Sequence, residues 1–324
     1  MVVDLANLDA IRLIIAQNES FAILTHVSPD GDAIGSALGF ALALRAIGKT
    51  AVAVCVDSVP SAVSFLPELE FCVQSIPDDA VCFSVDAADF RRLGKLSSQL
   101  QGRSILVNID HHISNTKFGD LNLVAPQAAA TGEYLADLLP LFGLPITSTV
   151  ALCLLTGIVT DTLGFRTPSA TAATLAVVMR LVAAGANLQL VMEHALNRRS
   201  VVVLHLWGCV LQRAVVDQGL IWSTVTLADK AAVGYALGDD GDVVNVLSTV
   251  DEVGVAVLFV EHINQQVKVS WRSRNGFDVA ALAVYFGGGG HRAAAGANLN
   301  NVTLDEAVTK VLAVTHSKLA AFLA

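Results

Sequence analysis

The residues best suited to chemistry are histidines and aspartates that gather in four short segments of the first half of the chain. The first segment is HVSPDGD at residues 26–32, which places an imidazole, His26, and two carboxylates, Asp30 and Asp32, on a turn built from proline and glycine. An aspartate-rich turn that caps the next helix would have the same composition, so both interpretations stay open for this segment alone.

The other three segments carry the same residue types. Asp86 follows an apolar run, where a lone aspartate is typical of a helix cap. Asp110, His111 and His112 close another apolar run, and two adjacent histidines after an acid are difficult to explain as packing. Asp161 interrupts an apolar, helix-like segment, TGIVTDT, for which a satisfied buried aspartate is the alternative. Mixed imidazole and carboxylate ligands suit Mn²⁺, Mg²⁺, Co²⁺ or Zn²⁺.

These side chains must be held together by the elements around them. Strand-like apolar runs alternate with helix-compatible stretches, which predicts a parallel sheet wrapped by helices. The candidate ligands follow three of the runs, and ligands of open α/β sheets lie outside the carboxyl ends of the strands. We therefore expect one crevice, in which five carboxylates would repel each other without cations. The four runs cover residues 21–25, 51–56, 81–85 and 104–109.

Length and composition fit a two-domain protein with a large core. The chain has 324 residues, of which 54% are hydrophobic and 15% charged. Its net charge of −9 argues against a protein that grips long nucleic acid through the phosphates. No uninterrupted apolar stretch of about 20 residues is present, and the charged first 20 residues do not suit a signal peptide. Five scattered cysteines suit a reducing compartment. We expect a cytoplasmic protein without a membrane partner.

The second half of the chain has a different pattern of helix-like and strand-like segments. The pattern is helical over residues 169–184 and again, as a long connector, from about 188 to 216. Strand-like runs follow, and a helical stretch precedes Phe286. We expect a first domain over residues 1–190, a helical connector over 191–216 and a smaller α/β domain over 217–324. The later strands are expected at residues 221–227, 254–260 and 266–271.

A basic and glycine-rich group near the carboxyl end could bind phosphate. Consecutive glycines let backbone N–H groups approach an anion closely, although a flexible turn is the ordinary explanation of such a run. Two arginines spaced two residues apart on a strand project to the same face. A further arginine after Asp161 is a candidate phosphate contact or a solvated loop residue. The candidates are Arg166, Arg272, Arg274, Gly288, Gly289, Gly290 and His291.

Together these motifs resemble the DHH phosphoesterase superfamily, named for a triplet seen here as Asp110, His111 and His112. The segments VKVSWRSR, at residues 267–274, and FGGGGHRAAAG, at residues 286–296, resemble its DHHA1 domain. The likeness covers nearly the whole chain and is greatest to the NrnA-like subgroup of oligoribonucleases and 3′-phosphoadenosine 5′-phosphate phosphatases. Two positions depart from the pattern: Trp271 stands where an aliphatic residue is expected, and Leu163 where glycine is expected.

The resemblance implies a two-metal site. It implies two divalent ions, manganese first, with magnesium, cobalt or zinc as alternatives. Asp110 would orient His111 or neighbouring groups, and His112 would face the phosphate as a donor or acid. The implied ligands are His26 and Asp30 for one ion, Asp32, His111 and Asp161 for the other, and Asp86 as a bridge between them.

The resemblance also implies a hydrolase of short oligoribonucleotides and small nucleotides such as 3′-phosphoadenosine 5′-phosphate, with no long nucleic acid as partner. The oligomeric state stays open, a homodimer included. A cyclic di-AMP or linear dinucleotide phosphodiesterase is the nearest alternative. A family II pyrophosphatase and a processive RecJ-type nuclease fit less well. The alternative from another functional class is a nucleotide-binding sensor without catalysis. All six expected ligand positions carry residues able to bind metal, which argues against a sensor.

Overall fold

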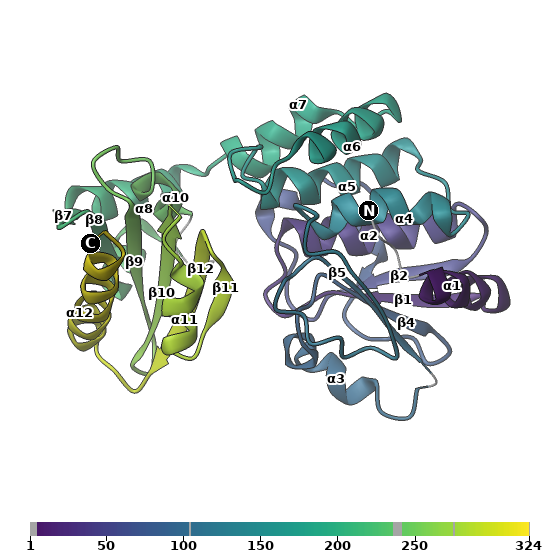
Figure 1. Cartoon of the computed structure of the whole chain (residues 1–324), viewed down its shortest axis with the longest axis horizontal. Coiled ribbons are helices and arrows are strands. Elements are labelled where there is room, and N and C mark those ends of the chain that lie inside the picture. Colours follow the sequence, from purple (N-terminus) through teal and green to yellow (C-terminus); the bar gives the residue numbers. More distant parts are fainter. Residues whose placement is uncertain (1–4, 104, 236–241, 275, 324) are drawn as a thin grey trace. The chain divides into compact units, whose positions relative to one another are not determined.

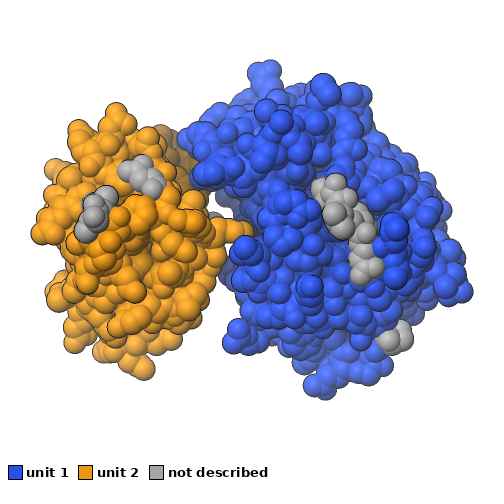
Figure 2. Space-filling model, in the orientation of Figure 1, with its two compact units in different colours: residues 1–198 blue, residues 199–324 orange. Residues whose placement is uncertain are grey.

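The computed structural model describes residues 5–103, 105–235, 242–274 and 276–323. The chain divides into two compact units, Met1–Arg198 and Arg199–Ala324 (Figure 2). Helix α8 (Val201–Gln212), which falls within the connector expected over residues 191–216, belongs to the second unit.

A six-stranded parallel sheet forms the centre of the first unit, in the order β3-β2-β1-β4-β5-β6. The expected α/β class with a parallel sheet is confirmed. Strands β4 and β5 are buried along their whole length, as is usual when helices cover both faces of a parallel sheet. The strands are β1 (Ser20–Leu24), β2 (Thr50–Val54), β3 (Cys72–Val73), β4 (Val81–Val85), β5 (Leu106–Asp110) and β6 (Leu121–Val124).

Alternate residues of these strands enter two different cores. Phe21 and Ile23 of β1 pack with the larger helices, whereas Ala22 and Leu24 pack with α3 and its neighbours. Figure 1 shows α2, α4, α5 and α6 above the sheet and α3 below it. The helices are α1 (Leu5–Gln17), α2 (Gly31–Arg45), α3 (Leu96–Gln99), α4 (Thr131–Leu141), α5 (Ser148–Asp161), α6 (Ala172–Ala183) and α7 (Leu188–Val191), with short 3₁₀ turns η1 (Ser61–Val63), η2 (Leu69–Phe71) and η3 (Phe90–Leu93).

Helices α2 and α5 approach each other closely because glycines line their contact. Gly31, Gly35 and Gly39 recur every four residues on α2 and therefore share one face of that helix. A Cβ atom on Gly35 would lie 2.4 Å from the carbonyl oxygen of Cys153 in α5. The close approach brings the start of α2 against the end of α5, so that Asp32 and Asp161 belong to one region of the unit.

The helical pattern expected from about residue 188 to 216 is divided among several helical segments in the structure. After α7 the chain forms a π-helical segment, η4 (Met192–Asn197), and three residues outside any helix precede α8. Ser200 accepts a hydrogen bond from the backbone N–H of Val203 and so starts α8 as a separate helix. Among the described residues no single helix is long and apolar enough to cross a membrane. The pair Ala172–Ala183 and Leu188–Asn197 has that length and composition only across a bend of 113°.

The second unit contains a mixed sheet in the order β11-β12-β10-β9-β8-β7, in which β8 and β9 pair in parallel and the other neighbours pair antiparallel. One face of this sheet packs on α11 and α12, and the other packs on α8 and α10. The elements are β7 (Val215–Asp217), β8 (Leu220–Val225), α9 (Leu227–Val233), α10 (Val243–Leu247), β9 (Val255–His262), β10 (Gln266–Ser273), α11 (Val279–Tyr285), β11 (Gly289–His291), β12 (Ala294–Asn300) and α12 (Leu304–Leu323).

Trp271, one of the two departures from the family pattern, is a core residue. Its side chain is completely buried in β10 and stacks on Phe286, with ring centroids 6.0 Å apart. The indole Nε1–H reaches Thr315 Oγ1 of α12 at 3.4 Å. The larger side chain therefore fills the space between the sheet and α12, and the indole nitrogen has a partner there.

Candidate metal centre

Three neighbouring strands of the first unit deliver the candidate ligands. Strand β1 leads to His26, β4 leads to Asp86, and β5 ends at Asp110 before His111. Because β1, β4 and β5 are adjacent and parallel, these residues emerge side by side at the carboxyl edge of the sheet. Asp86 has a φ of +59°, a left-handed conformation that is uncommon outside glycine and is frequent at functional sites.

The first cluster joins His26, Asp30 and Asp86. His26 Nε2 lies 3.9 Å from Asp30 Oδ2 and 3.7 Å from Asp86 Oδ2. The other oxygen of Asp30 accepts hydrogen bonds from the backbone N–H groups of Asp32 and Ala33 and caps α2. Asp30 thus uses one oxygen for the helix and turns the other toward the histidine.

The second cluster joins Asp32, His111 and Asp161 on the other side of Asp86. His111 Nε2 lies 3.6 Å from Asp86 Oδ1 and 3.2 Å from Asp161 Oδ2. Asp32, Asp86 and His111 are all buried, and their ligand atoms lie within 4.8 Å of one another. His111 is oriented by its Nδ1, which lies 3.2 Å from the carbonyl oxygen of Ala128.

These residues fit divalent cations. Two atoms that bind one ion at about 2.1 Å can be no more than about 4.2 Å apart, and the 3.2–3.9 Å separations between the histidine nitrogens and the carboxylate oxygens satisfy this limit. Asp32 is completely buried and Asp86 is 2% exposed, and a buried carboxylate is costly unless a cation compensates it. The ionic partners of Asp86 are His26, His111 and His112. Imidazole and carboxylate donors together are the set that manganese, magnesium, cobalt and zinc accept.

Asp110 orients His112. Asp110 Oδ1 lies 2.7 Å from His112 Nδ1, and its Oδ2 accepts a hydrogen bond of 2.6 Å from Asn115 Nδ2. The carboxylate is completely buried, whereas the His112 side chain is 23% exposed. Asp110 was expected to orient His111 or neighbouring groups. Its hydrogen bond goes to the neighbouring His112, while His111 contacts a backbone carbonyl.

The electrostatics of the cluster favour protonated histidines beside an ionised Asp86. Burial lowers the pKa of His111 and of His112, but bonds to Asp161 and Asp110 respectively, and the charge of Asp86, outweigh burial and raise both pKa values. Burial raises the pKa of Asp86, but the three histidines reverse this and lower it. Burial raises the pKa of Asp161 to about 6.

Burial also raises the pKa of Asp32, and the charges of Asp86 and Asp161 add to that effect. The ionised form of Asp32 has its own support, because two backbone N–H groups and a hydroxyl donate hydrogen bonds to it. Metal cations would oppose the remaining repulsion among the three carboxylates.

The structure also brings in residues that the sequence analysis did not identify. Ser36 and Thr131 donate hydrogen bonds to Asp32 and Asp86 respectively. Arg92, on η3, places a guanidinium nitrogen 2.9 Å from His26 Nδ1. Ser36 lies one helical turn after Asp32, a spacing that could have indicated the contact, whereas Thr131 and Arg92 come from distant segments.

The three candidate arginines donate hydrogen bonds to groups of their own unit. Arg166, after α5, donates to the carbonyl oxygen of Leu163 at 2.6 Å and is exposed. In the second unit, Arg272 Nε donates to Asn245 Oδ1 at 2.9 Å, and Arg274 lies 3.4 Å from the carbonyl oxygen of Ser248. The two arginines therefore both contact α10 or the residue that follows it.

The first half of the glycine run leaves a turn at Gly287, and its second half forms a strand. Residues 289–291 form β11, which pairs antiparallel with β12 at the edge of the sheet. A Cβ atom on Gly288 or Gly290 would lie 2.1 Å or 2.6 Å from a carbonyl oxygen of β12, so both positions require glycine for packing. A Cβ atom on Gly289 would meet nothing within 4 Å, and His291 is exposed. Gly289 and His291 are therefore the members of this run that packing against the sheet does not explain.

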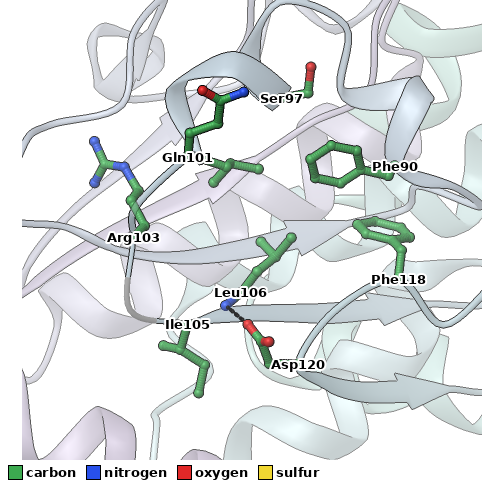
Figure 3. Close-up of a pocket in the computed structure, with 9 residues that line it drawn as sticks. Phe90, Ser97, Gln101, Arg103, Ile105, Leu106, Phe118 and Asp120 are labelled. Atoms are coloured by element: carbon green, nitrogen blue, oxygen red, sulfur yellow. Dashed lines mark hydrogen bonds between the residues drawn. The ribbon is translucent and has the colours of Figure 1, made fainter.

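A cavity of about 280 Å³ lies elsewhere in the first unit, on the face of the sheet that carries α3 (Figure 3). Its two charged side chains are already engaged: Asp120 Oδ2 accepts from the backbone N–H of Leu106, and Arg103 donates to several backbone carbonyls, that of Pro77 at 2.8 Å among them. The cavity contains none of the candidate metal ligands.

The fold and the ligand cluster define a phosphoesterase of the DHH type, which is a hydrolase. Residues 20–158 match the model of the DHH family, N-terminal domain, and residues 228–321 match that of the DHHA1 domain. The chain belongs to the DHH family, and the resemblance seen in the sequence is confirmed.

Known proteins place the chain with the NrnA-like subgroup. The bifunctional oligoribonuclease and PAP phosphatase NrnA of Thermus thermophilus is 37% identical over 92% of this chain and 89% of its own length. The cyclic-di-AMP phosphodiesterase GdpP of Geobacillus thermodenitrificans is 28% identical over 95% of this chain but only 49% of its own length. The crystal structure of an exopolyphosphatase-related protein from Bacteroides fragilis aligns with a TM-score of 0.90 at 26% identity, covering 99% of this chain and 98% of that chain.

Proposed function

We propose that this chain is a two-metal phosphoesterase that hydrolyses short oligoribonucleotides and small nucleotides such as 3′-phosphoadenosine 5′-phosphate. One observation carries the proposal: the two oxygens of Asp86 face different clusters. Oδ2 lies 3.7 Å from His26 Nε2, and Oδ1 lies 3.6 Å from His111 Nε2. One carboxylate can therefore serve two ions.

His26 and Asp30 would hold one ion, with Asp32, His111 and Asp161 holding the other and Asp86 shared. Two divalent ions, with manganese as the first candidate, would supply a nucleophile at neutral pH and neutralise charge on the phosphoryl oxygens. The chain's own contribution is to hold six ligands in place on strand ends and helix ends. Most of these side chains are buried, which limits their motion.

His112 is the candidate general acid. Asp110 holds its Nδ1 at 2.7 Å, which leaves Nε2 as the nitrogen that can pass a proton to the leaving oxygen. The bond to Asp110 and the charge of Asp86 outweigh burial and raise the pKa of His112, which favours the protonated ring that a general acid needs. Asp110 acts through His112 as a positioning residue.

The second unit would bind the nucleotide. Arg272 and Arg274 offer guanidinium groups that form charge-assisted hydrogen bonds with phosphate, and Gly289 and His291 offer an exposed backbone and imidazole. Arg166, in the turn after α5, would be a further phosphate contact in the first unit. The net charge of −9 supports preference for a substrate of a few nucleotides over a long strand.

The second candidate is a cyclic di-AMP or linear dinucleotide phosphodiesterase. The likeness to GdpP over 95% of this chain supports it. The same metal ligands would serve either substrate, so the two candidates differ in what the second unit selects.

A hydrolysis panel in Mn²⁺ tests the proposal. It would contain RNA of two to five nucleotides, 3′-phosphoadenosine 5′-phosphate, cyclic di-AMP, pyrophosphate and a long single-stranded RNA. We expect the highest kcat/KM on the short RNAs, with phosphate release from 3′-phosphoadenosine 5′-phosphate. An Asp86→Asn preparation, purified in parallel, measures contaminating nuclease. A preference for cyclic di-AMP would favour the second candidate, a preference for long RNA would indicate a processive nuclease, and metal binding without turnover would indicate a sensor.

A further inference from the structure

One short segment of the first unit contacts three candidate metal ligands that come from three different elements. The carbonyl oxygen of Ala128 accepts from His111, and the N–H groups of Thr131 and Gly132 donate to Asp32. The Thr131 hydroxyl donates to Asp86 Oδ1 at 2.9 Å. We propose that Thr131 is the positioning residue that sets the geometry of the bridging carboxylate; the inference rests on the two-metal function proposed above.

The hydroxyl of Thr131 fixes the rotation of Asp86. A carboxylate turns about its last side-chain bond with little intrinsic preference, so a neighbour must decide where its two oxygens point. Thr131 is completely buried, and its β-branched side chain has few rotamers. Its single hydroxyl proton is used on Oδ1, which holds that oxygen toward His111 and leaves Oδ2 toward His26. Without the bond, the carboxylate could turn so that neither oxygen faces its histidine.

The backbone of the same residue fixes Asp32. Helix α4 begins after Ala130, whose side chain cannot cap the helix. The carboxylate of Asp32, 99 residues before Thr131 in the chain, accepts hydrogen bonds from the first N–H groups of α4 instead. Thr131 N–H donates to Oδ2 at 2.6 Å, and Gly132 N–H and Ser36 Oγ donate to Oδ1 at 2.9 Å and 3.0 Å. Oδ1 therefore has both of its lone pairs engaged, and Oδ2 is the oxygen that keeps a lone pair for an ion.

Thr131 thus links two ligands of the same cluster through one residue. Its side chain bonds Asp86 and its backbone bonds Asp32, so the distance between these carboxylates depends on the position of Thr131. A purely structural role, in which the hydroxyl only satisfies a buried acceptor, would affect stability without a selective effect on ion binding.

Matched substitutions separate the two roles. Thr131→Val keeps the shape and removes the hydroxyl, whereas Thr131→Ser keeps the hydroxyl. Thr156→Val makes the same change at an equally buried threonine, whose hydroxyl donates to the carbonyl of Leu152 one turn earlier. If Thr131→Val does not fold, Thr131→Ala and Thr131→Ser form a pair that differs only in the hydroxyl oxygen.

Mn²⁺ binding to the full chain is measured by calorimetry, with the melting temperature in EDTA as the readout of stability. Removing a partner that orients a metal ligand typically weakens metal binding about 10- to 100-fold, and we expect this for at least one ion in Thr131→Val or Thr131→Ala. Thr131→Ser and Thr156→Val should stay within about threefold of the parent. Equal affinity in parent and Thr131→Val, or equal losses in the serine and alanine variants, would overturn the inference. Failure of the parent itself to bind Mn²⁺ would instead overturn the proposed function.

Discussion

Gly157 offers the sharpest test of how the fold positions the candidate metal centre. It lies in α5, where that helix meets α2, and a Cβ atom built on it would lie 2.3 Å from Asp32 Oδ1. Non-bonded carbon and oxygen atoms ordinarily lie about 3.3 Å or more apart, so alanine at this position overlaps the carboxylate by about 1 Å. Asp32 has little freedom to move away, because Ser36, Thr131 and Gly132 all hold it.

The structure sets the size of the effect. Overpacking a well-packed core typically costs about 1–3 kcal/mol. Displacing Asp32 also weakens hydrogen bonds to a charged group, each worth about 1.5–3 kcal/mol. We expect Gly157→Ala to lower the free energy of unfolding of the first unit by about 3 kcal/mol or more, and to weaken Mn²⁺ binding because Asp32 leaves its place.

The tryptophans make the assay specific to each unit. All three, Trp207, Trp222 and Trp271, lie in the second unit, so intrinsic tryptophan fluorescence reports on that unit while circular dichroism reports on both. Urea titration of Gly157→Ala should shift the dichroism transition and leave the fluorescence transition near that of the parent. Gly208→Ala is the matched control: Gly208 lies within α8, a Cβ atom there meets nothing within 4 Å, and the change should stabilise by about 0.5–1 kcal/mol. A Gly157→Ala protein with parental stability and Mn²⁺ affinity would refute the close-packing argument.

Three further predictions concern the chemistry. Asp86→Ala should abolish hydrolysis and reduce the bound Mn²⁺ measured by elemental analysis, and near-normal turnover would contradict the bridging role. His112→Ala should keep its metal and lose about 10²–10⁴-fold in rate, whereas a metal loss equal to that of His111→Ala would show that the two histidines were misassigned. Binding must displace protons from His111, whose pKa is raised, and below about pH 6 also from Asp161, whose pKa is about 6. Mn²⁺ affinity should therefore rise with pH, with proton release visible in calorimetry in buffers of different ionisation enthalpy, and a pH-independent affinity would contradict the assignment.

A substitution of Arg274 tests whether the second unit binds the nucleotide while the first unit carries the reaction. An arginine contact to phosphate is worth about 1.5–3 kcal/mol, and each 1.4 kcal/mol is about tenfold, so Arg274→Ala should lower kcat/KM on a dinucleotide by roughly 10- to 100-fold. The same variant should hydrolyse a small aryl phosphodiester nearly as well as the parent. Arg274 also contacts the carbonyl oxygens of Ser248 and Val250, so a structural role predicts a lower melting temperature and parallel losses on both substrates.

The parallel sheet was predictable because its strands are short apolar runs separated by helical patterns. Residues 81–85, for example, were expected as a strand and form β4 with the same bounds. The edge strands were harder, since β11 consists of two glycines and a histidine, a composition that is typical of a loop. Its strand conformation depends on pairing with β12, a contact between segments that local sequence patterns do not encode.

Residues with a left-handed backbone conformation show a second limit of prediction from sequence. Leu163 stands where the family pattern led us to expect glycine, and its φ is +50°, a conformation that glycine adopts more readily. Leu163 thus adopts a backbone conformation that glycine would adopt with less strain. Asp86 pairs a φ of +59° with a buried carboxylate, and nothing in its neighbours' residue types indicates that strain.

Two alternatives that the sequence left open turn out not to exclude each other. The segment at residues 26–32 could be a helix-capping turn or a ligand cluster. Asp30 takes part in both, because its Oδ1 caps α2 while its Oδ2 faces His26. Asp32 repeats the arrangement, because it caps α4 and keeps one lone pair toward the cluster. A carboxylate has about four acceptor positions, so one bond to a helix end can orient it and support its ionised form while another oxygen stays available to a cation. Residue types that favour caps are therefore weak evidence against a metal site when the cap stands at a strand end, because the cap supplies the rigidity that a ligand needs.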